Sequence, residues 1–309
     1  MPAPSASVAM LSGDASPTTV RRYRAVRRAV RAASVLCLWK RKEFVEAALA
    51  RIFGNLAEAD GHLLEIEPND RSIGARLRRT GRWDPRERIL YERELRPGMT
   101  VVDAGANVGY FTLLFARLVG PRGKVYAFEP DPRNFDLLQR NIRRNGYGNV
   151  VAARLALSRE NGRRKFSRSP HNFADHCLGD GLGPRESLEV EVARLDTFFA
   201  DLPKQVDFLK LDIQGAEFGA IDGATELLRA NPEIVLLSEF WPDGMRRFGD
   251  DPERYLEALR ALGFSLRLVG GRSRPRLLPI DRVADLFRLC EGERFVNLLG
   301  RRAASGGLT

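Results

Sequence analysis

Four acidic residues of this 309-residue chain each follow an apolar run that is typical of a buried strand. They are Asp103, Glu129, Asp212 and Glu239. In an open parallel sheet, ligands bind beyond the carboxyl ends of the strands, so we expect these carboxylates to line one rim and to form a ligand site. Taken singly, each acid is also explained as a helix N-cap or a turn residue, and Asp212 could cap a helix that begins near Ala216.

The turn after the first of these strands indicates the kind of ligand. It reads Asp103-Ala-Gly105-Ala-Asn107-Val-Gly109, and glycines without a Cβ let the backbone approach a ligand closely. A dinucleotide turn presents glycine amides to a pyrophosphate, which a carboxylate would repel. The same carboxylate suits an ammonium or a sulfonium, and S-adenosyl-L-methionine carries both, together with a ribose and no phosphate. Glu129, 26 positions after Asp103, is placed to bind the two ribose hydroxyls.

Methyl transfer to a hydroxyl needs an aligned acceptor and a group that takes the proton. By residue type, His176 is the best-placed base, and Asp175 and Asn172 could orient it or hold substrate hydroxyls. Alternatively, Asp212 and Glu239 could share a divalent cation, because hard cations prefer oxygen ligands.

The elements that must position these residues alternate between strands and helices, which is typical of a doubly wound, mostly parallel, Rossmann-like α/β sheet. A long loop within residues 163–195 interrupts the alternation. Seven strands are predicted at 100–104, 124–129, 149–154, 206–212, 233–239, 264–269 and 294–299, and helices at 108–119, 132–145, 216–230 and 252–262.

Length and composition are those of one large α/β core with an N-terminal appendage. The segments that we expect are a disordered tail (1–20), a basic helical extension (21–60), a pre-core segment with a helix at 85–94 (61–98), the cofactor-binding domain (99–300) and a tail (301–309). The three cysteines, Cys37, Cys177 and Cys290, predict no disulfide framework, and no apolar run is long enough to cross a bilayer. A cytoplasmic protein is the simplest expectation.

The net charge of +10 is concentrated near the start, where residues 21–42 hold nine basic residues and no acidic one. Such a run is a solvated helix face, a membrane-surface helix or a nucleic-acid arm. The run does not form an interleaved aromatic stacking platform of the kind that single-strand binders use, which disfavours the last of these.

Several blocks of the chain together resemble the FkbM family of S-adenosyl-L-methionine-dependent methyltransferases, over residues 64–300. They include VVDAGANVGYFTL, YAFEPDPRNFDLLQRNIRRNG, VDFLKLDIQGAEFGAIDGA and EIVLLSEFWPDGMRRFG. The resemblance implies the class I methyltransferase fold. It also implies S-adenosyl-L-methionine as the donor and a hydroxyl of a sugar, glycan or secondary metabolite as the acceptor.

The resemblance also assigns roles to residues of this chain. It implies that Glu217 and Asp212 lie near the transferred methyl, and it brings Trp241 in as a substrate-binding candidate. Gln214 replaces an acid of many members, which disfavours a metal. The loop NFADHC resembles the N-x-G-D-H-R loop of some members, with Ala174 and Cys177 as departures. The implied cofactor residues are Asp103, Gly105, Asn107, Gly109, Glu129 and Asn134.

Two other function classes stay open on the sequence. A nucleic-acid-modifying methyltransferase would use the basic run, although the chain lacks the N-P-P-[YF] type of motif of base N-methylating enzymes. A non-catalytic protein that contacts a membrane through residues 21–42 is the other alternative. The sequence does not specify an oligomeric state.

Overall fold

The computed structural model describes Ala9–Met10, Ala25 and residues 55–302, apart from 68–69, 71, 170–175, 180–184, 272–273 and 293. Most of the two predicted N-terminal segments lies outside these residues. So do two of the predicted site residues, Asn172 and Asp175.

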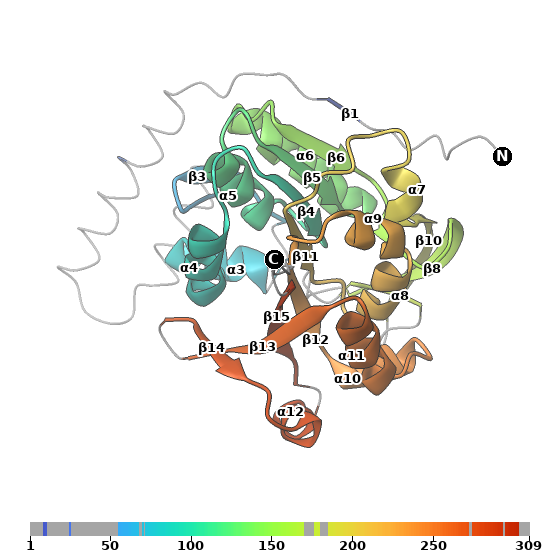
Figure 1. Ribbon diagram of the computed structural model, residues 1–309. Coiled ribbons are helices and arrows are strands. Elements are labelled where there is room, and N and C mark those ends of the chain that lie inside the picture. Colours follow the sequence, from blue (N-terminus) through green and yellow to red (C-terminus); the bar gives the residue numbers. More distant parts are fainter. Residues whose placement is uncertain are drawn as a thin grey trace.

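A nine-stranded sheet forms the centre of the protein, in the order β1-β6-β5-β4-β11-β12-β15-β13-β14 (Figure 1). The inner strands from β6 to β12 are parallel, and β15 runs antiparallel to both of its neighbours. The strands are β1 (Ala9–Met10), β4 (Thr100–Ala104), β5 (Lys124–Phe128), β6 (Val150–Ala153), β11 (Phe208–Leu211), β12 (Val235–Phe240), β13 (Phe264–Gly270), β14 (Arg276–Pro279) and β15 (Val296–Arg302).

The seven predicted strands are the inner seven. The five parallel ones, β4, β5, β6, β11 and β12, are buried almost throughout, which gives them the mostly apolar runs that the sequence shows. The prediction of seven strands was nevertheless wrong by two, since β1 and β14 extend the edges. β1 is two residues long and lies where the sequence predicts a disordered tail, and β14 is exposed along its whole length. The short length of β1 and the exposure of β14 leave no buried apolar run for a sequence pattern to detect.

Helices cover both faces of the sheet (Figure 1). On one face, α4 (Pro85–Glu94), α5 (Tyr110–Val119) and α6 (Pro132–Arg144) bury their apolar residues in one core cluster. A second cluster on the other face includes residues of α7 (Leu195–Phe198), α8 (Glu217–Asp222), α9 (Thr225–Ala230), α11 (Pro252–Ala261) and α12 (Val283–Leu289). The helices α3 (Ile73–Thr80) and α10 (Pro242–Arg247) complete the covering layers.

The predicted helix 216–230 is two helices, α8 and α9, which are separated at Gly223. A Cβ at Gly223 would lie 2.0 Å from the carbonyl oxygen of Ser158, so the chain at this point packs directly against another backbone segment. That close contact, rather than helix propensity, sets where the first helix ends.

Two regions of the structure differ from their sequence predictions. Residues 163–195, within which the sequence predicts a long loop, contribute three strands to a second sheet of order β7-β10-β8-β9: β8 (Gly162–Arg168), β9 (Cys177–Leu178) and β10 (Glu186–Ala193), joined by β7 (Ala156–Leu157). The predicted helical extension ends in a hairpin instead, β2 (Leu56–Ala59) and β3 (His62–Glu65). In that hairpin His62 is buried, and its Nε2 lies 2.7 Å from the hydroxyl of Tyr147.

None of the helices in the described part of the chain is both long and apolar enough to span a bilayer.

The turns that follow β4 and β11 touch each other. Gly105 has a φ of 77°, and a Cβ built on it would lie 1.9 Å from the carbonyl oxygen of Asp212. From the sequence, we expected Gly105 to let the backbone approach the ligand closely. In the structure, it lets the ends of two neighbouring strands approach each other.

We predict that Gly105→Ala destabilises the protein far more than Gly98→Ala. Both glycines have a positive φ, so both alanines strain the backbone. Only at position 105 would the new Cβ also overlap a backbone atom, since no described atom lies within 4 Å of the corresponding position at Gly98. In urea denaturation we expect losses of about 1 kcal/mol for Gly98→Ala and about 3 kcal/mol or more for Gly105→Ala. Equal losses would contradict the contact.

Candidate active site

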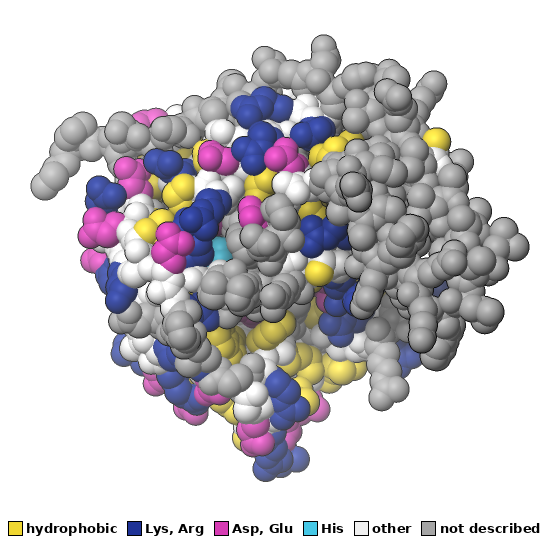
Figure 2. All heavy atoms as spheres, turned by 180° about the vertical axis from the view of Figure 1, so that it is seen from behind, with side chains coloured by type: hydrophobic (Ala, Val, Ile, Leu, Met, Phe, Trp, Pro, Cys, Tyr) yellow, Lys and Arg dark blue, Asp and Glu magenta, His cyan; other side chains and the backbone are white. Residues whose placement is uncertain are grey.

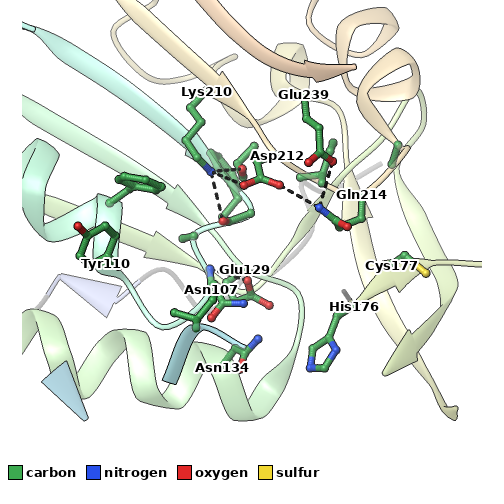
Figure 3. A pocket seen from close by; sticks show the side chains of 18 of the residues that line it. Asn107, Tyr110, Glu129, Asn134, His176, Cys177, Lys210, Asp212, Gln214 and Glu239 are labelled. Atoms are coloured by element: carbon green, nitrogen blue, oxygen red, sulfur yellow. Dashed lines mark hydrogen bonds and ion pairs between the residues drawn. The ribbon is translucent and has the colours of Figure 1, made fainter. Parts of the chain in front are cut away.

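A cavity of about 600 Å³ opens at the carboxyl ends of β4, β5, β11 and β12. Figure 3 shows two groups of side chains in it. Asn107, Glu129 and Asn134 form what we call the Glu129 end. The Asp212 end consists of Glu87, Asp212, Gln214 and Glu239, all of which line the same cavity. Three of the four acids that were predicted to line one rim, Glu129, Asp212 and Glu239, therefore do line this cavity.

The carboxylate of Glu129 is fixed by two backbone amides. Its Oε2 accepts from the N–H of Asn107 at 2.8 Å, and its Oε1 accepts from the N–H of Asp131 at 2.9 Å. Asn107 reaches this position with a φ of 51°, a left-handed conformation that asparagine tolerates. Burial, and next the charge of Asp131, raise the pKa of Glu129 to about 8. Each oxygen keeps a second lone pair for a ligand hydroxyl.

Asn134, in the first turn of α6, carries an unusual polar group. Its side chain is 1% exposed, and neither its amide nitrogen nor its amide oxygen has a hydrogen-bond partner among the described residues. Buried amides are almost always paired, and Asn134 lines the cavity beside Glu129 (Figure 3). The orphaned amide is the mark of a site that a polar ligand completes.

Gly105 lines the cavity, but Gly109 does not appear among its lining residues. Gly109 precedes α5 with a φ of 94°, and a Cβ there would lie 2.8 Å from Cδ1 of Leu138. This predicted cofactor residue thus serves the packing of α5 against α6.

Asp103 does not face the cavity, contrary to the sequence prediction. It is fully buried; its Oδ1 lies 3.2 Å from Nζ of Lys210, and its Oδ2 accepts from the hydroxyl of Thr112 at 2.6 Å. Lys210 stands beside Asp103 in the register of β11 and β4, which makes the ion pair a direct cross-strand contact. Asp103 therefore acts on the site through Lys210.

Lys210 is a functional residue that the sequence reading missed, although a lysine inside the apolar run FLKL was a usable signal. Its Nζ lies 3.7 Å from Oδ2 of Asp212 and 3.3 Å from the carbonyl oxygen of Ala104. Burial opposes its charge, but the carboxylates of Asp103 and Asp212 outweigh burial and raise the pKa of Lys210 above its ordinary value. Lys210 is thus a fixed cation in the cavity wall.

Gln214 joins two carboxylates of the cavity. Its Nε2 donates to Oδ1 of Asp212 at 3.1 Å and to Oε2 of Glu239 at 3.0 Å (Figure 3). Burial, and then the charges of Asp212 and Glu217, raise the pKa of Glu239 well above its ordinary value, which favours its protonated form. The Asp212 end therefore presents both hydrogen-bond donors and acceptors.

Glu217, predicted to bind substrate, lies under the turn rather than on the cavity. It is fully buried, and its Oε1 accepts from the N–H of Ile213 at 3.0 Å. Burial raises the pKa of Glu217 to about 8. Its position makes it the residue that holds the turn bearing Asp212 and Gln214.

Glu87 enters the site from α4, before the predicted core, and the sequence reading missed it. Its Oε1 accepts from Nδ2 of Asn297 at 2.6 Å, and its Oε2 accepts from the hydroxyl of Tyr91 at 3.1 Å. Burial, followed by the charges of Asp212 and Asp84, raises the pKa of Glu87 to about 7. No strand end or glycine turn marked this position.

His176 and Trp241 both line the cavity. His176 is 9% exposed, and its Nδ1 accepts from the N–H of Ser169 at 3.1 Å. The indole Nε1 of Trp241 is buried without a hydrogen-bond partner, and the guanidinium of Arg247 lies 4.9 Å from the centre of its ring. Their neighbours Asn172 and Asp175 lie outside the described residues.

Residues 103–266, more than half of the chain, match the family model described as a methyltransferase FkbM domain. The chain belongs to the FkbM methyltransferase family. The match confirms the resemblance stated from the sequence, and the topology of the central sheet fits the class I methyltransferase fold.

Several curated relatives of this FkbM-family chain carry methyltransferase names. It is 30% identical to "Methyltransferase 1" of Beauveria bassiana over 143 residues, which are 40% of this chain and 57% of that protein. It is 40% identical to the 31-O-demethyl-FK506 methyltransferase FkbM of Streptomyces tacrolimicus over 101 residues, or 33% and 36% of the two chains. It is 29% identical to the hexuronic acid methyltransferase AglP of Haloferax volcanii over 153 residues, or 48% and 59%. The matches span about a third to three fifths of these relatives.

From the sequence, a divalent cation shared by Asp212 and Glu239 was an alternative for this FkbM-family site. Within the described residues, no three His, Cys, Asp or Glu side chains are grouped so that they could hold an ion. Asp212 and Glu239, the pair predicted as alternative ligands, share the amide of Gln214.

We predict that the stability of this FkbM-family protein, without ligand, falls as the pH rises from about 5 to about 8. Burial raises the pKa of Glu87 to about 7 and those of Glu129 and Glu217 to about 8. In this window the unfolded chain binds fewer protons than the folded one, so the free energy of unfolding decreases with pH. Melting temperatures across the range measure the effect.

The variant Glu217→Gln tests how much one of these carboxyl groups contributes to the pH dependence of stability. Glutamine keeps an acceptor for Ile213 but has no ionised form, so we expect the variant to gain on the order of 1 kcal/mol over the wild type at pH 8 and nothing at pH 5. Glu226→Gln, at an exposed position of α9, is the matched control and should leave the curve unchanged. A parallel shift of the Glu217→Gln curve at both pH values would contradict the assignment.

Proposed function

We propose that the protein transfers the methyl group of S-adenosyl-L-methionine to a hydroxyl of a sugar, glycan or secondary metabolite. The observation that carries the proposal is the pairing of two unlike ends in one cavity. One end offers a fixed carboxylate and an orphaned amide, and the other offers a carboxylate and a carboxylic acid joined by an amide.

The Glu129 end fits the nucleoside of the donor. A ribose presents two adjacent hydroxyls, and the two oxygens of Glu129 each keep a lone pair to accept one of them. The amide of Asn134 has both a donor and an acceptor available for the polar edge of the ligand. When bound, the donor supplies a methyl group on a positively charged sulfur.

The Asp212 end fits a hydroxylated acceptor. A hydroxyl donates one hydrogen bond and accepts others, and here it meets the Asp212 carboxylate as an acceptor and the protonated Glu239 as a donor. The printed names of two relatives, a 31-O-demethyl-FK506 methyltransferase and a hexuronic acid methyltransferase, are consistent with such acceptors. Alignment of the acceptor oxygen is then the main contribution of these residues to the rate.

His176 fits the role of a hydrogen-bond donor better than that of the base predicted from the sequence. Because Nδ1 accepts from the amide of Ser169, the proton of the neutral ring resides on Nε2. A ring in that tautomer can donate to an acceptor oxygen but has no lone pair at Nε2 to take a proton. The proton must therefore go to a carboxylate.

The nucleic-acid alternative has little support in the described structure. It depends on residues 21–42, of which only Ala25 is described. On the face shown in Figure 2, basic and acidic side chains of the described residues are interspersed and form no single basic field. The alternative therefore serves as an outcome of the acceptor experiment.

We predict that Glu129→Ala weakens the binding of S-adenosyl-L-methionine by about 10-fold to 100-fold, because two hydrogen bonds between the ribose hydroxyls and the buried carboxyl group are lost. Isothermal titration calorimetry measures the change. Glu233→Ala, at an exposed position before β12, is the control and should bind normally. Normal affinity in Glu129→Ala would refute the placement of the ribose.

For the acceptor, we predict that Asp212→Asn lowers turnover by about 100-fold or more and changes the affinity for the donor only slightly. Purified enzyme is incubated with methyl-labelled S-adenosyl-L-methionine and fractionated metabolite, glycan and RNA pools, and the product is identified by mass spectrometry and NMR. A methyl ether on a hydroxyl is the expected product. Label found in RNA would refute the proposed acceptor class, and label found on nitrogen would refute O-methylation.

A further inference from the structure

Glu87 is a carboxyl group in the cavity wall that contacts neither the donor nor the acceptor in the proposed function. It extends from α4 toward the same cavity as Asp212 and Glu239, and Lys210 is the cation that lies among these three acids. Asp103 and Glu217 lie behind them, and the cations that act on this group of carboxyls are Lys210 and, close to Glu87, Arg86. Such a cluster gains stability when another positive charge enters it.

Two side chains hold Glu87 in one orientation. Asn297 donates to one oxygen at 2.6 Å and Tyr91 to the other at 3.1 Å. Asn297 lies opposite Glu239 in the register of β15 and β12, so the same strand pair places two of the acids. Each oxygen of Glu87 keeps a further lone pair directed by this fixed carboxylate plane.

We propose that Glu87 takes up the proton that methyl transfer releases from the acceptor hydroxyl, an inference that rests on the proposed O-methylation. The hydroxyl oxygen forms the new bond to the methyl carbon, and the electron pair of the broken carbon–sulfur bond stays on sulfur. The hydroxyl proton passes to an oxygen of Glu87. A proton thereby replaces the sulfonium charge, and the charge of the cluster is the same before and after the reaction.

The other acids of the cavity fit this task less well. Burial and the neighbouring acids favour the protonated form of Glu239, and the oxygens of Asp212 already face Nζ of Lys210 at 3.7 Å and accept from Nε2 of Gln214 at 3.1 Å. For Glu87, burial and the charges of Asp212 and Asp84 raise the pKa to about 7, against the opposing effects of Lys210 and of the Tyr91 hydroxyl. A base with a pKa near the working pH is the most effective one.

The charge exchange can be measured without an acceptor. A sulfonium near Glu87 favours its ionised form, so binding of S-adenosyl-L-methionine should release a proton that S-adenosylhomocysteine, a neutral thioether, leaves in place. Calorimetric titrations at pH 7 in buffers of different ionisation enthalpy count the protons. We expect the donor to release about half a proton more than the product, because Glu87 is about half protonated at that pH. Glu129 contacts a part that both ligands share, so it cancels.

Glu87→Gln should abolish this difference and still bind S-adenosylhomocysteine, which also shows that the variant is folded. Glu92→Gln is the matched control, since Glu92 lies on the same helix and is exposed. It should retain the wild-type difference. If Glu87→Gln binds neither ligand, Asn297→Ala provides the test instead. Loss of the hydrogen bond from Asn297 should raise the pKa of Glu87 and so move the maximum of proton release to a higher pH.

An equal release of protons with donor and product in the wild type would overturn the inference, as would an unchanged difference in Glu87→Gln, or in Asn297→Ala where that variant decides. Either result would leave the proposed O-methylation standing. Conversely, a methylated nitrogen or RNA in the acceptor experiment would refute the proposed function whatever the calorimetry shows.

Discussion

The buried ion pair between Lys210 and Asp103 is the contact on which the site depends. The two residues are neighbours in the register of β11 and β4, and both are almost entirely excluded from solvent. Removing one partner of such a pair leaves an uncompensated charge in the interior, so neither residue is freely replaceable. The pair fixes the relative position of two strand ends, and those ends carry Gly105 and Asp212.

The same ion pair sets the electrostatics of the cavity. Lys210 supplies one positive charge to a group of carboxyls that burial would otherwise keep neutral, and the charge favours ionisation most where it is closest. Asp212 lies beside the lysine, whereas Glu239 is held protonated by burial and by the neighbouring acids. A mixture of carboxylate and carboxylic acid results. Such a mixture can hold a hydroxyl by both its hydrogen and its oxygen, which neither form alone can do.

Much of the fold could be predicted because a strand that is buried on both faces needs a run of mostly apolar residues. The runs at β4, β5, β11 and β12 are mostly apolar, as is typical of strands covered on both faces. Edge strands lack that constraint, and so β1 and β14 were missed. The break between α8 and α9 also left no local signal, because it results from the contact of Gly223 with a distant carbonyl.

The sequence by itself determined the family, the sheet and the strand-end positions of the acids, because these follow from hydrophobic periodicity and from short motifs. Only the tertiary structure decided what each acid does. Asp103 and Glu129 both follow a strand, yet one is paired beneath the wall and the other faces the cavity. Glu87 joined them from a helix outside every motif. Side-chain direction and the pairing of charges depend on packing between distant segments, and no local pattern encodes that packing.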